Sequence, residues 1–249
     1  MGWWKNARRF RRGAIGVLAM LAASVPGAAS GDGTDYRLLM FDGVPVKWGS
    51  SDLGTSAHVT WGLQSDVRRD ATAINCKATR NLDGLLRYAG MSETQFRAQV
   101  RAAFAMWEAV ANIRFTEAAP GVRADIVIAA QLEPRGIAWT DLKLHGASQP
   151  AELLNRVSQG EPVADRIKAS MICLNPNETW RIGFDGNLKT YDVRYVVAHE
   201  IGHAIGLDHP GKDGQVMGFA YQENLTALTP GDAEGARHLY GRRSLAGVE

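Results

Sequence analysis

The chain has 249 residues, of which 45% are hydrophobic and 22% are charged. This length and composition fit one or two folded domains with a proper core, and they exclude wholesale disorder. Lysine and arginine number 28 against 26 acidic residues, but five of the basic residues lie within the first 12 positions. The rest of the chain is therefore mildly acidic, which argues against a nucleic-acid partner.

The first 30 residues have the three zones of a secretory signal peptide. A cationic segment ends at Arg12, an apolar stretch runs over 14–23, and small residues follow. The apolar stretch is much shorter than the roughly 20 residues that span a bilayer, which makes an uncleaved membrane anchor the less favoured alternative. We expect cleavage near Ala29, with 1–29 as the signal peptide and 30–249 as one exported domain, extracellular or periplasmic. The Arg11-Arg12 pair leaves the twin-arginine route open beside general secretion.

Strands and loops are expected before and between the helices of the domain. The polar stretch 65–90 is expected to be a loop with a short helical piece, and 141–168 a long surface loop that contains a short helix over 151–157. Alternating or β-branched apolar residues predict four strands, and a fifth, shorter segment is a candidate edge strand. In chain order these segments are 57–63, 113–116, 124–129, 136–140 and 169–175.

Three helices are predicted from caps and apolar spacing. Ser92 and Gln95 form a capping-box pattern before apolar residues spaced three and four apart, up to Ala111. Asp192 is a good N-cap for a second helix. The third helix covers 230–240, with Thr229 as the cap and Pro230 in the first turn.

The chemistry of the chain is concentrated between His199 and His209. His199 and His203 are four residues apart and therefore project from the same helix face. Gly206 ends the helix and lets the departing chain return His209 to the same ion. Glu200 lies beside the ligand face and can reach water on the metal without being a ligand. A helix with surface histidines and a glycine cap is the competing interpretation, which the added Gly206 and His209 disfavour.

Three neutral imidazoles leave one coordination position of a single Zn²⁺ open to water, which is typical of catalytic rather than structural sites. Zinc lowers the pKa of that water towards neutrality. Glu200 can accept the proton as general base and pass it to the leaving amine.

The extended histidine pattern followed by a Met-turn is the metzincin signature, and Met217 stands at a suitable spacing. Further segments resemble the matrixins, the matrix metalloproteinase type of metzincin, so that the resemblance covers roughly 45–241. It implies an α+β (α/β sandwich) catalytic domain with a twisted, mostly parallel five-stranded sheet, three helices and a cleft beside the edge strand. It also implies that Met217 is an apolar floor beneath the zinc. The resembling segments are 47–61, 103–117, 124–128 and 228–241.

The chain departs from the family pattern near the zinc. The family usually has proline two residues after the methionine, where this chain has Phe219, while Tyr221 is retained. Phe219 and Tyr221 are expected to line the substrate pocket. His145 lacks the aspartate of the family's second, structural zinc site, which is therefore not predicted. Asp185-Gly186-Asn187 fits a solvated turn better than a Ca²⁺ site.

Two cysteines, Cys76 and Cys173, lie far apart in the sequence. In an exported protein they are most simply a disulfide, with two unrelated free thiols as the alternative. Cys76 is outside the Pro-Arg-Cys-Gly context of the family's inhibitory cysteine, so that role is disfavoured.

These features predict a secreted zinc endopeptidase that acts on a protein or peptide substrate as a monomer, without stable membrane insertion once the signal is removed. The alternative is a zinc-containing module that binds an extracellular peptide or glycan without cutting it. Glu200 argues against that alternative, because a binding module has no chemical need for the carboxylate. The sequence does not separate a degradative protease from one restricted to a single partner protein.

Overall fold

The computed structural model describes residues 35–119, 121–145 and 150–243, so the predicted signal peptide lies outside the described residues. Four parallel strands form the body of the sheet, in the order β7-β4-β8-β10. The fifth, β9, pairs antiparallel with β10 and is an edge strand. The five expected strands are thus present and mostly parallel, in a sheet that has nine strands among the described residues. The bounds are β4 Ala57–Leu63, β7 Ile113–Glu117, β8 Ile126–Gln131, β9 Ala138–Leu144 and β10 Asp165–Leu174.

Short strands extend this sheet and form two small pairs outside it. β3 pairs with the first residues of β10 and with β2. β6 pairs with the last residues of β8 and with β5. Outside the sheet, β1 pairs with β13, and β11 with β12. Their bounds are β1 Arg37–Leu38, β2 Met40–Phe41, β3 Val44–Lys47, β5 Arg68–Arg69, β6 Ala78–Arg80, β11 Trp180–Arg181, β12 Tyr191–Asp192 and β13 Leu207–Asp208.

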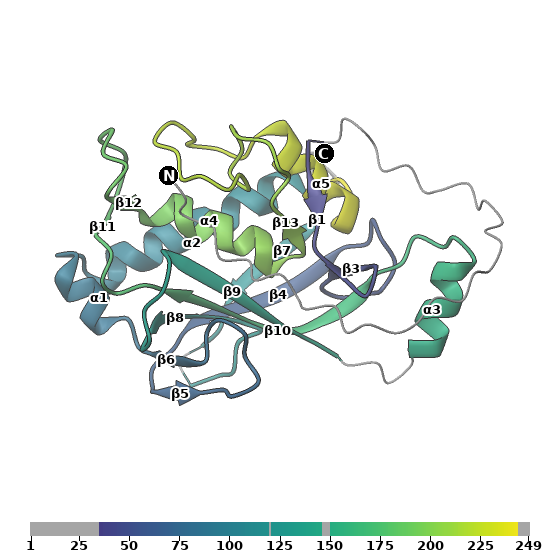
Figure 1. Ribbon diagram of the computed structural model, residues 1–249, viewed down its shortest axis with the longest axis horizontal. Coiled ribbons are helices and arrows are strands. Elements are labelled where there is room, and N and C mark those ends of the chain that lie inside the picture. The colour runs from purple at the N-terminus through teal and green to yellow at the C-terminus, as the bar shows by residue number, and fades with distance from the viewer. Residues whose placement is uncertain (1–34, 120, 146–149, 244–249) are drawn as a thin grey trace, which may run out of the picture.

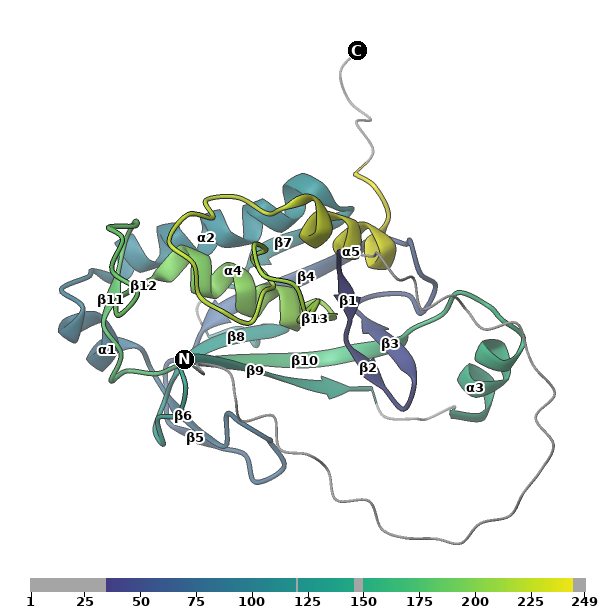
Figure 2. The ribbon, with the colours of Figure 1, turned by 45° about the horizontal axis from the view of Figure 1, so that its top comes forward.

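The three predicted helices, α2 (Glu93–Val110), α4 (Val193–Ala204) and α5 (Pro230–Tyr240), lie together over one face of the sheet (Figures 1 and 2). The capping box of Ser92 and Gln95 is present, and Thr229 is the N-cap of α5. The buried indole of Trp107 in α2 donates to the carbonyl of Ala198 in α4 over 2.9 Å. This bond fixes the two longest helices against each other.

Two further helices, α1 (Asp83–Tyr88) and α3 (Pro150–Ser158), stand apart from this layer at opposite ends of the molecule (Figure 1). They correspond to the short helical pieces expected inside the two loop regions. The expectation of an otherwise irregular loop over 65–90 was wrong, because β5 and β6 lie there and are defined by their pairing with each other and with β8. The loop expectation was wrong at both ends of 141–168, because β9 continues to Leu144 and β10 begins at Asp165. Polar residues in these strand ends hid them, and charged residues are common on edge strands.

A disulfide joins Cys76 to Cys173, as the simplest interpretation of the two cysteines predicts. Cys173 lies in β10 and Cys76 in the segment before β6, so the bond ties that segment to the sheet. None of the described helices combines the length and the apolar character that crossing a membrane requires.

Candidate active site

Helix α4 and the turn after it position the histidines. The Asp192 carboxylate caps α4 by accepting from the backbone N–H of Tyr195 at 2.7 Å. The helix ends at Ala204, and Gly206 follows with a φ of 105°. A Cβ at Gly206 would lie 2.1 Å from the carbonyl oxygen of Val46, so only glycine fits this turn. The chain then enters β13, immediately before His209.

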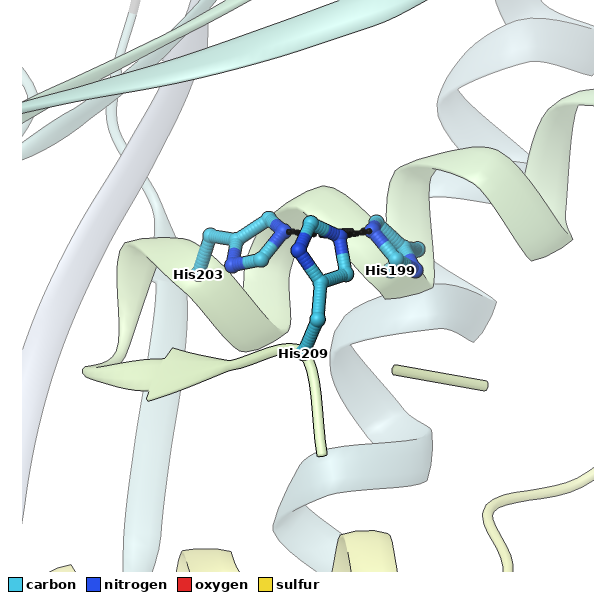
Figure 3. A group of neighbouring side chains, drawn as sticks. All are labelled: His199, His203 and His209. Atoms are coloured by element: carbon cyan, nitrogen blue, oxygen red, sulfur yellow. Dashed lines mark hydrogen bonds between the residues drawn. The ribbon is translucent and has the colours of Figure 1, made fainter. Parts of the chain in front are cut away.

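The side chains of His199, His203 and His209 converge on one point (Figure 3). Their three Nε2 atoms are 3.1, 3.2 and 3.2 Å apart. A tetrahedral zinc ion with bonds of 2.0–2.1 Å would separate its nitrogen ligands by about 3.3 Å. The three nitrogens are therefore spaced for one small tetrahedral cation.

The second nitrogens of two rings fix their tautomers. Nδ1 of His199 lies 2.6 Å from the carbonyl oxygen of Val216, and Nδ1 of His203 lies 2.8 Å from that of Leu207. A carbonyl oxygen only accepts, so each Nδ1 carries a hydrogen and donates it. Each Nε2 then presents a lone pair towards the same point, where a cation meets both. Orientation of a ligand histidine through its other nitrogen is a general feature of metal sites.

Burial lowers the pKa of all three imidazoles, and that of His209 falls to about 3. The like-charged partners His203 and His209 lower the pKa of His199 further. Neutral imidazole is the form that binds a metal, because the ligand lone pair must be unprotonated. The protein thus keeps the three rings in the ligand form across the neutral pH range.

Glu200 lies on the same helix and is 1% exposed. Its Oε2 accepts from the hydroxyl of Thr140 at 2.6 Å, while Oε1 has no hydrogen-bond partner among the described residues. Burial raises the pKa of the carboxyl to about 7, and the Thr140 hydrogen bond opposes this rise. A carboxyl with a pKa near neutrality can both take up and release a proton at physiological pH.

Met217 lies directly beneath α4. A Cβ at Gly202 would lie 2.1 Å from the Met217 sulfur, so the missing side chain of Gly202 lets the methionine approach. The Asp232 carboxylate in α5 accepts from the backbone N–H groups of Val216 and Met217, each at 3.0 Å. Asp232 therefore fixes the turn whose Val216 carbonyl orients His199. Sequence reasoning missed Asp232, although Thr229-x-x-Asp232 has the spacing of a capping box.

The two expected pocket residues have different surroundings. Phe219 is 43% exposed and stacks on His209 with ring centroids 4.1 Å apart. Tyr221 accepts from the backbone N–H of Asp192 at 2.8 Å and packs edge-on against Tyr195. A cavity beside His199 is lined by Tyr195 and Tyr221 but holds only about 10 Å³, room for a single water. Tyr221 and Tyr195 therefore nearly close it.

A second cavity, of about 210 Å³, also has Tyr195 in its lining. Its walls are mainly apolar and include Met106, Ile182 and Leu225. At the turn 185–187, the Asp185 carboxylate pairs with Arg181 at 2.9 Å and accepts from the Asn187 N–H at 2.8 Å. The solvated turn and the Ca²⁺ site both stay predictions.

The family model of the matrixins matches residues 84–241, well over half of the chain. The chain belongs to the matrixin family. It is 31% identical to stromelysin-3 of Rattus norvegicus over 61% of its length, and 26% identical to matrix metalloproteinase-19 of Mus musculus over 62%. Metalloendoproteinase 5-MMP of Arabidopsis thaliana is 29% identical over 56% of this chain.

The aligned part of this matrixin covers only 28%, 27% and 38% of those three relatives. Matrixins are zinc metalloendopeptidases with a catalytic zinc ion, and the group of His199, His203 and His209 fits that ion in number, spacing and protonation. The resemblance inferred from the sequence and the predicted zinc cofactor are both confirmed.

Proposed function

We propose that this protein is a secreted zinc endopeptidase that hydrolyses peptide bonds of protein substrates, with Glu200 as the general base. Three histidines, His199, His203 and His209, would hold the ion. The observation that carries the proposal is their convergence beside the buried Glu200 carboxylate, whose Oε1 has no hydrogen-bond partner among the described residues. A zinc ion bound there would act as a Lewis acid that polarises the scissile carbonyl group and lowers the pKa of water.

The protein's own groups account for binding and proton transfer. Among the described residues β9 pairs with β10 alone and lies at an edge of the sheet, so an extended peptide can add to it as a further strand. Oε1 of Glu200, which has no partner among the described residues, is the oxygen that takes the proton of the attacking water. Glu200 then delivers that proton to the leaving amine.

Phe219 and Tyr221 flank the site where the substrate side chain next to the scissile bond enters. Phe219 shields one face of the His209 ring from water, and Tyr221 with Tyr195 limits the depth of the cavity. Met217 supplies the apolar floor. We therefore expect small side chains to be preferred at this position of the substrate.

The remaining predictions concern the setting of the enzyme. Residues 1–29 serve as a signal peptide, and 30–249 form one catalytic domain that works as a monomer outside the cytoplasm. The acidic balance of the mature domain and the disulfide are consistent with such an environment. The same arrangement accommodates a broad degradative role and cleavage of a single partner protein.

The test is the purified mature chain with zinc and its Glu200→Ala variant, assayed on labelled casein and on a peptide library. We expect the parent to cleave and the variant to lose at least about a hundredfold in kcat/KM, because general-base catalysis contributes 10²–10⁴-fold. Zinc content, measured by metal analysis, should be equal in both. If the variant cleaves as fast as the parent, Glu200 is not the base, and if neither protein cleaves any library member, the binding-module alternative replaces the enzyme.

A further inference from the structure

The hydroxyl of Thr140 makes the closest polar contact of the Glu200 side chain. Its oxygen lies 2.6 Å from Oε2 of Glu200 and 3.0 Å from the backbone carbonyl oxygen of the same residue. A threonine hydroxyl has one hydrogen, and a charged acceptor forms the shorter and stronger bond. When Glu200 is ionised, the hydrogen therefore goes to the carboxylate.

This contact fixes the orientation of the carboxylate. With Oε2 held by Thr140, rotation about the terminal bond of Glu200 is restricted, and Oε1 is left for the attacking water. When Oε1 carries the proton, Oε2 remains a hydrogen-bond acceptor, so the Thr140 hydroxyl can keep donating to it. The carboxyl group is then held in the same orientation before and after it takes up the proton.

Thr140 is itself held firmly in edge strand β9. It lies opposite Ile172 of β10, and its neighbour Asp141 accepts from the backbone N–H groups of Asn75 and Cys76 at 2.9 and 2.8 Å. The Cys76–Cys173 disulfide ties that segment back to β10. The strand that carries the hydroxyl is thus anchored on the side away from α4.

We propose that Thr140 is a positioning residue that holds Glu200 in the orientation required for proton transfer, and that it links this orientation to the edge strand on which the peptide binds. The inference rests on the proposed function, because it assumes that Glu200 is the base. Thr140 lies in the strand that a bound peptide would extend, while its hydroxyl is bonded to the base. One side chain therefore connects substrate alignment with the proton acceptor.

The test compares Thr140→Val and Thr140→Ser with the parent, each as the zinc-loaded mature protein, on a quenched fluorogenic peptide selected from the library. Valine keeps the branched shape that suits a strand but removes the hydroxyl, whereas serine keeps the hydroxyl. Thr140→Val loses the hydrogen bond to the charged Glu200 carboxylate. Its kcat should therefore fall about 10- to 100-fold, with KM changed less than about threefold. Thr140→Ser should stay within about fivefold of the parent.

Thr60→Val is the matched control. Thr60 lies in β4, and its hydroxyl donates to the Asp125 carboxylate at 2.7 Å, so this change removes the same kind of bond outside the metal site. We expect near-parental kcat for Thr60→Val, and equal zinc content in all four proteins. Zinc content and thermal midpoint are read for each, which gives a measurement independent of activity.

The inference would be overturned by parental kcat for Thr140→Val, by an equal loss of kcat for Thr140→Ser, or by an equal loss of kcat for Thr60→Val. A Thr140→Val protein that has lost its zinc would also overturn it, because the residue would then act on the metal site as a whole. These outcomes are distinct from failure of the proposed function. That function fails when Glu200→Ala remains active, whatever the Thr140 variants do.

Discussion

The Cys76–Cys173 disulfide provides the most direct test of how this fold is stabilised. The bond joins residues 97 positions apart, and the closed segment runs from β6 through the helices α1 to α3 and the strands β7 to β9 into β10. Both cysteines are buried. The perturbation is the double replacement Cys76→Ala with Cys173→Ala, which removes the cross-link and leaves small apolar side chains in its place.

The expected loss follows from the length of the closed loop. Cross-linking a loop of roughly 100 residues removes chain entropy from the unfolded state that corresponds to about 4.7 kcal/mol at 25 °C. Domains of this size have a free energy of unfolding of about 5–15 kcal/mol. The double variant should therefore lose a third or more of its stability. Its unfolded chain should also expose more surface, so its free energy of unfolding should fall more steeply with denaturant concentration.

The assay is urea unfolding of the parent and the double variant, followed by fluorescence and circular dichroism under non-reducing conditions. For the double variant we expect a lower urea midpoint, a larger m-value and a free energy of unfolding about 3–5 kcal/mol below that of the parent. The single variants Cys76→Ala and Cys173→Ala serve as controls, because each lacks the same bond and should unfold like the double variant. A loss below about 1 kcal/mol with an unchanged m-value, or two free thiols in the unfolded parent, would refute the reasoning.

Three further changes test the site. In the zinc-free protein the Glu200 pKa is raised from 4.5 to about 7, so the stability that this carboxyl contributes is full below pH 4.5 and is lost as the pH rises through 7. The free energy of unfolding, measured in urea at pH 5 and pH 8, should therefore change by up to about 3 kcal/mol less in Glu200→Gln than in the parent. An equal change in both proteins would contradict this prediction. Gly202→Ala places a Cβ against the Met217 side chain, so we expect reduced zinc content and a free energy of unfolding lower by about 1–3 kcal/mol. Parental zinc content and stability would show instead that the Met217 turn can move. Tyr195 lines both the small cavity beside His199 and the cavity of about 210 Å³, so we expect Tyr195→Ala to join them. Peptide-library profiling should then show a shift towards long apolar side chains, and an unchanged profile would count against this assignment of the pocket.

The parts of the fold that were predictable are those set by local rules. Ser92 and Thr229 cap their helices as the sequence indicates, and the strand 57–63 was bounded correctly, because alternation and capping act within a few residues. The three histidines were predictable for the same reason. Helical spacing places His199 and His203 on one face of α4, and Gly206 at a positive φ allows the turn that leads to His209.

The parts that escaped prediction depend on partners distant in sequence. Thr140 was placed in a candidate edge strand, but nothing near it in the sequence shows that its hydroxyl reaches Glu200, 60 residues later. Asp232 was hidden in the same way, because its partners Val216 and Met217 lie in a preceding loop. The end of β9 escaped because Asp141 and Lys143 interrupt the apolar pattern, and only the pairing with β10 defines them as strand.

The short pair of β1 with β13 has a consequence for the order of assembly. His199 and His203 lie within one turn of α4 and need only that helix, whereas His209 follows a strand that is held by Arg37 and Leu38 at the other end of the described chain. Contacts between such distant segments form late, since the chain between them must be ordered first. We therefore expect the third ligand to join the other two last. Tight metal capture would then mark the completion of folding, and a partly folded chain would offer only two imidazoles and no active centre.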